Sequence, residues 1–335
     1  MKALSKPKVT IYEVARLAGV SIATVSRTLR GSDLVVPETR AKVLAAAEQL
    51  NFTPSRLGRS LAEGRHAANG IVFPDLIGPY YAEVVLGYEE AASELGRSVL
   101  ILTTHGRRDA VAQVQDLAGR VDGLVIMGRT VSDEVVADLA RAGTPIVLLA
   151  RDPVGDLDTV SAENEATAKQ LTEHLLAHGH RRFAFLGNPD ESPDVVGRYR
   201  GFANALDNPP APTRCGFDVD AGHAAAKRLL GKKSRPDAIV CANDELALGV
   251  HLAATEAGLS IPADVAVTGW DDVMAARFVG LTTARQPMRE LGGAAARRLH
   301  ERIAKRLQDR PQRRVLPTQL VVRHSCGTHS LGGTT

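Results

Sequence analysis

From residue 67 onward the sequence alternates short apolar runs with helix-like patterns, and this alternation limits the possible folds more than any other feature. Apolar runs occupy 69–74, 97–102, 121–127 and 144–150, and a second set occupies 181–187, 236–242, 264–270 and 318–323. Runs of this length are typical of parallel strands buried on both faces. Helical patterns lie between them, at 80–95, 108–118, 132–142, 164–178, 196–207, 221–230, 243–257 and 288–308. We therefore expect an α/β fold of two doubly wound parallel-sheet lobes, with ligands bound in the cleft between them.

The stretch 10–31, TIYEVARLAGVSIATVSRTLRG, has a different pattern and predicts two short helices joined by a tight turn. Thr10 and Glu13 have the spacing of a capping box, and Ser21 is a good N-cap for the second helix. That helix begins with small or hydrogen-bonding residues and carries Arg27. This composition lets a helix lie deep in the DNA major groove. An ordinary αα-hairpin is the alternative.

A third helix is expected from Pro37 to Asn51, because proline is favoured in the first turn of a helix. Its residues Leu44, Ala47 and Leu50 are predicted to close a three-helix core. The segment that follows is polar, basic and too short to form a stable helix alone. Its proline and serine would suit a helix that forms on binding, and a plain basic linker is the alternative.

Charge is unevenly distributed along the 335 residues. Residues 1–65 contain 11 Lys and Arg against 5 Asp and Glu, a net +6, whereas the remainder carries 30 against 33, a net −3. A basic head on a slightly acidic body indicates that the head alone meets a polyanion. Three widely spaced cysteines favour a reducing compartment over a disulfide framework. We expect no signal peptide in MKALSKPKVT and no membrane span, and therefore a cytoplasmic protein.

Several motifs together resemble the lactose/galactose repressor (LacI/GalR) family of bacterial transcription regulators. They are the helix pair above, VVPETRAKVLAAAEQLNFTPSRLGRSL, HLLAHGHRRFAFLG, RYRGF, CANDELALG, DVAVTGWDD and LTTARQ. The resemblance covers essentially the whole chain. It implies a helix-turn-helix headpiece, a hinge helix that folds on operator DNA, and a body like the periplasmic sugar-binding proteins. It also implies a homodimer with an effector cleft in each chain.

The resemblance assigns DNA-binding roles to three groups of residues. Ile22, Ala23 and Arg27 match base-reading positions, and an arginine can make a bidentate contact with guanine. Phosphate contacts, which set the register on DNA, suit Thr10, Ser21, Thr24 and Ser26. Leu61 matches the hinge leucine that is wedged into the minor groove, and Arg56, Arg59 and Ser60 surround it. Packing of Leu61 against the body is the alternative.

The resemblance also assigns the effector site. Arg198 matches the effector-binding arginine and Asp271 its acidic partner, a pair that suits a polyhydroxylated ligand. The other expected lining residues are Asp75, Tyr80, Tyr81, Phe217, Asn243, Trp270 and Gln286. Core packing is an alternative for Phe217 and Trp270. Asp244 either lines the cleft or caps the helix that it opens.

The family pattern is not matched everywhere. Ala150 stands where some members have an aspartate, and Met127 occupies a position that is often polar, so no effector can be copied from a characterised member. No heptad repeat follows Arg323, so a dimer is expected rather than a tetramer. The expected domains are a headpiece (1–53), a hinge (54–66), an N-terminal lobe (67–162 with 288–315), a C-terminal lobe (163–287 with 316–326) and a disordered tail (327–335).

An enzyme, a metal-binding protein and a sugar carrier are the alternatives to a DNA-binding regulator. No dinucleotide fingerprint or nucleophile elbow is present, so we expect no enzyme activity and no cofactor. His174 and His178 have a zinc-like spacing, but no cysteine or carboxylate near them in the sequence completes a site, so no metal is expected. A sugar carrier of the periplasmic type is the main alternative. The sequence therefore predicts a regulator, most simply a repressor, that binds near-palindromic operator DNA under control of a small polar effector, which is expected to be a carbohydrate.

Overall fold

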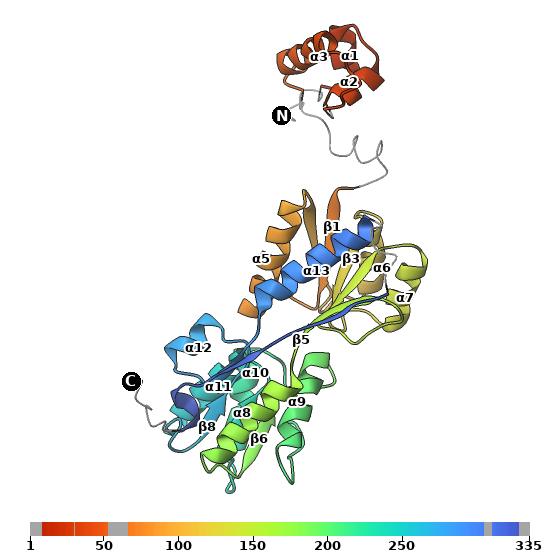
Figure 1. Cartoon of the computed structure of the whole chain (residues 1–335). Helices are drawn as coiled ribbons and strands as arrows, with labels where there is room; N and C mark the ends of the chain where they lie inside the picture. The colour runs from red at the N-terminus through yellow and green to blue at the C-terminus, as the bar shows by residue number, and fades with distance from the viewer. Residues whose placement is uncertain (1–8, 30, 53–65, 305–309, 328–335) are drawn as a thin grey trace, which may run out of the picture. The chain divides into compact units, whose positions relative to one another are not determined.

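The chain divides into two units, residues 1–66 and residues 67–335, and each is described by itself. The computed structural model describes residues 9–29, 31–52, 66–304 and 310–327 (Figure 1). The predicted hinge residues Arg56, Arg59, Ser60 and Leu61 lie outside these ranges, as do residues 328–335 of the predicted tail.

The first unit contains three helices, α1 (Ile11–Ala18), α2 (Ile22–Leu29) and α3 (Pro37–Gln49). At the start of α1, the Glu13 carboxylate accepts a hydrogen bond from the Thr10 backbone N–H at 2.7 Å. Gly19 ends this helix with φ +66°, a conformation that glycine adopts without steric cost. Ser21 Oγ then accepts the backbone N–H of Thr24 at 3.1 Å, which caps the start of α2.

The core of the first unit is built from small and β-branched residues. Val14, Val25 and Val43 are fully buried, and Ala46 packs with them. The prediction that Leu44 closes this core is wrong, because 49% of that residue is exposed. The buried stripe of α3 begins one residue earlier, at Val43, and the helical period then turns Leu44 toward solvent.

The second unit begins with a six-stranded sheet in which every pairing is parallel. Its strand order is β10-β5-β4-β3-β1-β2. The strands are β1 (Ala68–Phe73), β2 (Ser98–Thr103), β3 (Leu124–Met127), β4 (Ile146–Leu149), β5 (Asp158–Ala162) and β10 (Arg313–Leu316). The helices around it are α5 (Pro79–Glu94), α6 (Ala110–Ala118), α7 (Asp133–Arg141) and α13 (Met288–Ile303).

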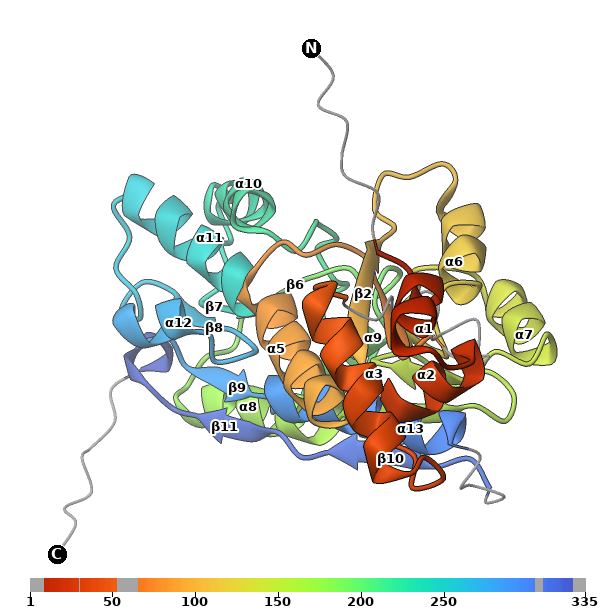
Figure 2. The ribbon, with the colours of Figure 1, turned by 90° about the horizontal axis from the view of Figure 1, so that it is seen from above.

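Helices cover both faces of this sheet, as the apolar strand sequences require. Along β1, Ile71 and Phe73 pack in a cluster with α5 and α13, whereas Val72 packs in a second cluster with α6 and α7. Figure 2 shows α6 and α7 on the side of β2 opposite to α5. Successive residues of a strand point to opposite faces, so one strand supplies both cores.

The second lobe has a three-stranded parallel sheet in the order β6-β7-β8. Its strands are β6 (Phe183–Leu186), β7 (Ala238–Cys241) and β8 (Ala266–Thr268). Its helices are α8 (Glu165–Ala177), α9 (Pro193–Asn204), α10 (Val219–Leu230), α11 (Asp244–Glu256) and α12 (Met274–Phe278). The antiparallel pair β9 (Thr283–Arg285) and β11 (Gln319–Val321) and the 3-10 turn η1 (His324–Cys326) complete it.

Three short segments join the two lobes of the body (Figure 1). The chain leaves the large sheet between β5 and α8, returns between β9 and α13, and leaves again between β10 and β11. Side chains at these crossings therefore belong to the connection itself and lie where the strand ends of both lobes meet. Within the described residues, none of the helices has the length and apolar character of a membrane span.

Close packing of α5 against α13 depends on two glycines. A Cβ atom built on Gly87 would lie 2.0 Å from the carbonyl oxygen of Arg289, and one on Gly292 would lie 2.1 Å from that of Val84. Both contacts are to backbone of the opposite helix, so a side chain at either position would force the helices apart.

We expect Gly292→Ala to destabilise the body by about 1–3 kcal/mol, the usual cost of overpacking a core. The matched control is Gly119→Ala, where the nearest atom to the new Cβ is 3.5 Å away, and a change within about 1 kcal/mol is expected. Urea unfolding followed by circular dichroism measures both. Equal midpoints for the two variants would contradict the helix contact.

Candidate functional site

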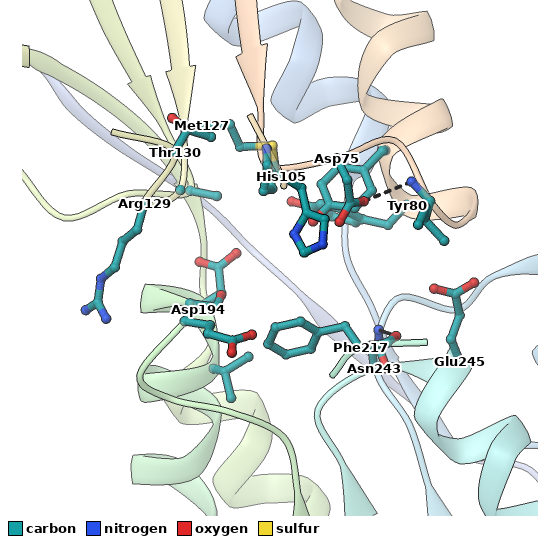
Figure 3. Close-up of a pocket in the computed structure, with 18 of the residues that line it drawn as sticks. Asp75, Tyr80, His105, Met127, Arg129, Thr130, Asp194, Phe217, Asn243 and Glu245 are labelled. Atoms are coloured by element: carbon teal, nitrogen blue, oxygen red, sulfur yellow. Dashed lines mark hydrogen bonds between the residues drawn. The ribbon is translucent and has the colours of Figure 1, made fainter. Parts of the chain in front are cut away.

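A cavity of about 610 Å³ lies where the two lobes of the body face each other. Residues of the first lobe enter it after β1, β2, β3 and β4, and residues of the second lobe enter it after β6, β7 and β8. Figure 3 shows Asp75 and His105 reaching in from the first lobe, opposite Asp194 and Phe217 of the second. The carboxyl ends of parallel strands are the usual ligand sites of such sheets.

Arg198 of α9 is held in one orientation at the wall of this cavity. Its Nε donates to Asn164 Oδ1 at 2.8 Å, and its Nη1 donates to the carbonyl oxygen of Ala242 at 2.6 Å. The guanidinium carbon lies 4.7 Å from the ring centroid of Trp270, within cation–π distance. Its Nη2 lies 3.9 Å from Asp194 Oδ2, beyond hydrogen-bond distance. These contacts fix the orientation of the Arg198 side chain at the cavity wall.

Asp271 follows β8 and lies in the same cavity with strained backbone. Its φ is +115°, a region that side-chain-bearing residues rarely adopt. Its carboxylate accepts a hydrogen bond from Gln286 Nε2. Burial raises the pKa of Asp271 to about 7, although the nearby Arg198 guanidinium and the Gln286 hydrogen bond act in the opposite direction. Burial also raises the pKa of Asp194 above its ordinary value.

Three polar atoms at the cavity are buried without a hydrogen-bond partner among the described residues. They are Tyr80 Oη, Thr130 Oγ1 and Gln286 Oε1. Buried polar groups are nearly always paired, so such atoms at a cavity wall are suited to bind a polar ligand or water. Tyr80 and Thr130 belong to the first lobe, and Gln286 lies at a crossing.

The cavity brings together most of the residues predicted for the effector site. Its lining includes Asp75, Tyr80, Tyr81, Arg198, Phe217, Asn243, Asp271 and Gln286. Trp270 is not among the lining residues, since 2% of it is exposed and its ring lies beneath Arg198. Trp270 therefore supports the Arg198 guanidinium from below and does not line the cavity. The binding roles of the lining residues stay predictions.

Asp244 has neither of the two roles considered for it. It is absent from the cavity lining, and Asn243 is the residue that caps α11, accepting the Leu246 N–H at 3.0 Å. The fully buried Asp244 carboxylate instead accepts hydrogen bonds from Val273 N at 2.9 Å and Thr283 Oγ1 at 2.6 Å. It therefore ties the loop after β8 to β9.

Several polar residues that line the cavity were not predicted from the sequence. They are His105, Arg129, Thr130, Asp190, Glu191, Ser192, Asp194, Asp218 and Glu245. Asp194 had a readable signal, because it lies four residues before Arg198 on one helix face. Arg129 had none, because its partner is across the cavity: its Nη1 donates to the carbonyl oxygen of Asp190 at 2.6 Å.

In the first unit, α2 presents the side chains predicted to read bases. Ile22, Ala23 and Arg27 are exposed, whereas Val25 is buried on the opposite face of the helix. Among the predicted phosphate-binding residues, Thr10 and Ser21 are exposed, and Thr24 and Ser26 are half-buried. The surface has the small residues and the arginine that major-groove entry requires.

The family model described as bacterial regulatory proteins of the lacI family matches residues 10–55. A second model, the periplasmic binding protein-like domain, matches residues 172–326. Catabolite control protein A of Priestia megaterium is 32% identical over 313 residues, covering 90% of this chain and 94% of that protein. The transcriptional repressor PurR of Haemophilus influenzae (strain PittEE) is 32% identical over 305 residues, covering 88% and 91%.

Two solved structures are similar over nearly the whole chain. The lac repressor dimer bound to operator and the anti-inducer ONPF has a TM-score of 0.84 and 29% identity, and the match covers 96% of this chain and 100% of that one. The complex of the transcriptional regulator CelR with cellobiose has a TM-score of 0.72 and 31% identity, with coverage of 95% and 100%.

The raised pKa of Asp271 predicts a pH dependence of stability. Its pKa of about 7 in the folded chain exceeds the unfolded value of about 4. The folded state therefore binds the extra proton, and this group's stabilisation is lost as pH rises from about 4 to about 7. Asp271→Asn removes that contribution. We expect the free energy of unfolding of Asp271→Asn, relative to that of the wild type, to rise by on the order of 4 kcal/mol between about pH 4 and about pH 7. Above about pH 7 the difference should be constant.

Urea unfolding at a series of pH values measures this difference. Asp116→Asn, which changes an exposed carboxylate on α6 far from the cavity lining, is the control and should give a flat difference. A flat difference for Asp271→Asn as well would contradict the buried, proton-binding carboxyl.

Proposed function

The chain belongs to the LacI family of bacterial regulatory proteins, and we propose that it represses transcription by binding near-palindromic operator DNA as a homodimer. It is a DNA-binding transcriptional regulator with an effector-binding body, and its relatives are regulators rather than enzymes. The observation that carries the proposal is one chain with both a lacI-type head and a two-lobed body with a polar cavity. A carrier of the periplasmic type has no use for such a head.

We propose that α2 is the recognition helix of each headpiece. Arg27 would contact guanine, Ile22 and Ala23 would touch thymine methyl groups or permit close approach, and phosphates would bind Thr10, Ser21, Thr24 and Ser26. The hydroxyl of Ser21 already caps α2, so its phosphate contact would share that oxygen. A dimer with two-fold symmetry predicts the near-palindrome.

The proposed effector is a neutral polyhydroxylated molecule, most simply a carbohydrate. Seven carboxylates line the cavity, at Asp75, Asp190, Glu191, Asp194, Asp218, Glu245 and Asp271, against the guanidinium groups of Arg129 and Arg198. This balance disfavours a phosphorylated or otherwise anionic ligand. Carboxylates and an oriented arginine suit hydroxyl groups, and Phe217 offers an apolar face. Related structures are described with cellobiose and with ribose.

We propose that the effector acts through the angle between the lobes, which would control pairing of the two hinge segments of a dimer. The domain boundaries predicted above are part of this proposal, with 54–66 as hinge and Leu61 as minor-groove wedge. Coupling between effector and operator is reciprocal, so operator DNA changes effector affinity by the same factor. A DNA partner also makes the cytoplasm the proposed location.

Replacing Arg27 by Ala should reduce the preference for operator over random DNA by roughly tenfold to a hundredfold, the range expected for one bidentate base contact. Operator sequences are first selected from a random library with the wild-type chain. The wild type and Arg27→Ala are then titrated against the selected DNA and against scrambled DNA. Nonspecific binding with its steep salt dependence should remain.

Lys42→Ala is the control, because this exposed lysine on α3 pairs with Glu38 at 2.9 Å and is not a proposed base reader. Its operator preference should equal that of the wild type. A normal preference in Arg27→Ala would remove the recognition role of that residue.

Replacing Arg198 by Ala should abolish the effect of sugar on operator binding, while operator binding without sugar persists. An effector is first found by thermal-shift screening of neutral sugars and sugar phosphates against the wild-type chain. Arg200→Ala is the control: it is on the same helix, but it pairs with Glu165 at 3.4 Å and does not line the cavity. A full sugar response in Arg198→Ala would place the effector elsewhere, and a hit confined to sugar phosphates would contradict the neutral ligand.

A further inference from the structure

A cluster of two histidines and one cysteine lies in the second lobe, outside the cavity. His174 is in the last turn of α8, His178 is the residue that ends this helix, and Cys326 closes η1. Their ligand atoms all lie within 4.8 Å of one another. The sequence alone predicts no zinc site here, because no nearby cysteine or carboxylate completes one with these histidines. The fold supplies the cysteine from 152 residues beyond His174.

The separations in this cluster approach those of a metal site. Tetrahedral zinc has Zn–N distances of about 2.0–2.1 Å and Zn–S distances of about 2.3 Å, which place neighbouring ligand atoms about 3.3–3.7 Å apart. His174 Nε2 and Cys326 Sγ are already 3.3 Å apart. The two imidazole rings are inclined at 73° with centroids 4.7 Å apart, and the ligand atoms would have to draw together from at most 4.8 Å to surround one metal ion.

The backbone next to the cluster is adapted to this close approach. Gly327 has φ +145°, and a Cβ atom built there would lie 2.7 Å from His178 Nδ1. Only glycine lets the chain pass the His178 ring at this distance. The carbonyl oxygen of Cys326 is 2.9 Å from His180 Nε2, a contact that fixes the cysteine backbone in place.

The electrostatic surroundings favour a cation with a thiolate ligand. His174 and His178 lie at the carboxyl end of α8, where the unsatisfied carbonyl groups carry partial negative charge. Thr282 Oγ1 lies 2.9 Å from Cys326 Sγ, and its one proton, which can be donated to the Arg323 carbonyl oxygen at 3.1 Å, can be donated to a thiolate instead. Cys326 is fully buried, and a bound cation would compensate the charge that a buried thiolate carries.

We propose that His174, His178 and Cys326 form a zinc site that fastens the end of the body to α8. Imidazole and thiolate ligands together are those that zinc prefers. His329, the next histidine in the sequence, follows Cys326 by three positions and lies outside the described residues, so the proposal rests on the three described ligands. The site would anchor η1, which follows the last crossing between the lobes.

The test uses the full-length chain, stripped of metal with a chelator and then titrated with Co²⁺ and Zn²⁺. We expect one metal per chain and a thiolate-to-cobalt charge-transfer band that zinc abolishes. Cys326→Ser should remove that band, and His178→Gln should weaken zinc binding by more than about tenfold, since even outer-shell changes cost that much. At equal zinc concentration, zinc should raise the thermal unfolding midpoint of the wild type by more than that of His178→Gln, because the stabilisation falls as the dissociation constant rises.

Cys215→Ser and His223→Gln are the matched controls. Cys215 is a half-buried thiol and His223 pairs with Glu256 at 3.0 Å, and neither belongs to the cluster. Both controls should bind cobalt and zinc as the wild type does. Absence of a thiolate band in the wild type, or wild-type affinity in a folded His178→Gln chain, would overturn the site. Circular dichroism establishes that each variant is folded.

Discussion

The body depends on polar side chains at the three crossings between its lobes. At the first crossing, Asn164 accepts a hydrogen bond from Arg198 at 2.8 Å and donates one to Asp194 at 3.0 Å. At the second, Gln286 donates to Asp271. At the third, Thr318 Oγ1 lies 2.8 Å from Thr167 Oγ1 of α8. The connections are thus bonded to the groups that line the cavity, or to the helix beside them.

This arrangement gives a physical route from ligand to lobe angle. A hydroxyl group that binds Arg198 or Asp271 competes with, or extends, hydrogen bonds to Asn164 and Gln286, which are parts of the connection itself. A ligand shifts a conformational equilibrium only by its difference in affinity for the two states. In the proposed mechanism, that difference would arise from the bonds that join the crossings to the cavity-lining groups Arg198 and Asp271. The first-lobe atoms Tyr80 Oη and Thr130 Oγ1, buried without hydrogen-bond partners among the described residues, offer contacts on the side of the cavity opposite Arg198.

The sequence predicted the fold wherever burial is continuous. The strands that the apolar runs indicated are present with ends shifted by up to three residues, as 121–127 against Leu124–Met127 illustrates. The expectation of a buried parallel strand at 318–323 is wrong, because β11 pairs antiparallel with β9 and is not buried. Besides the short β9 (TAR), the strands β5 and β10 were missed, because DTVSA and RRVL lack an apolar run. They are held by specific bonds instead: the buried Asp158 accepts hydrogen bonds from Arg298 at 2.7 Å and from the Gln312 backbone at 2.8 Å. Such partners, more than 100 residues apart, have no local signal.

The functional sites were limited in the same way, because contacts between residues far apart in the sequence have no local signal. Arg198 and Asp271, each placed by its own motif, line the cavity as expected. Trp270, adjacent to Asp271, lies beneath Arg198 instead, and the backbone turns between the two residues, since Asp271 has φ +115°. Cys326 shows the limit most clearly. Its own neighbourhood, HSCG, contains no metal-ligand spacing with His174 or His178. Their meeting follows from the third crossing, which returns the chain to the second lobe and pairs β11 with β9. That pairing sets where η1 lies against β8 and α8. The spacing of two residues in the sequence can therefore indicate a pair of candidate ligands on one helix. Only the topology decides which distant residue lies beside that pair.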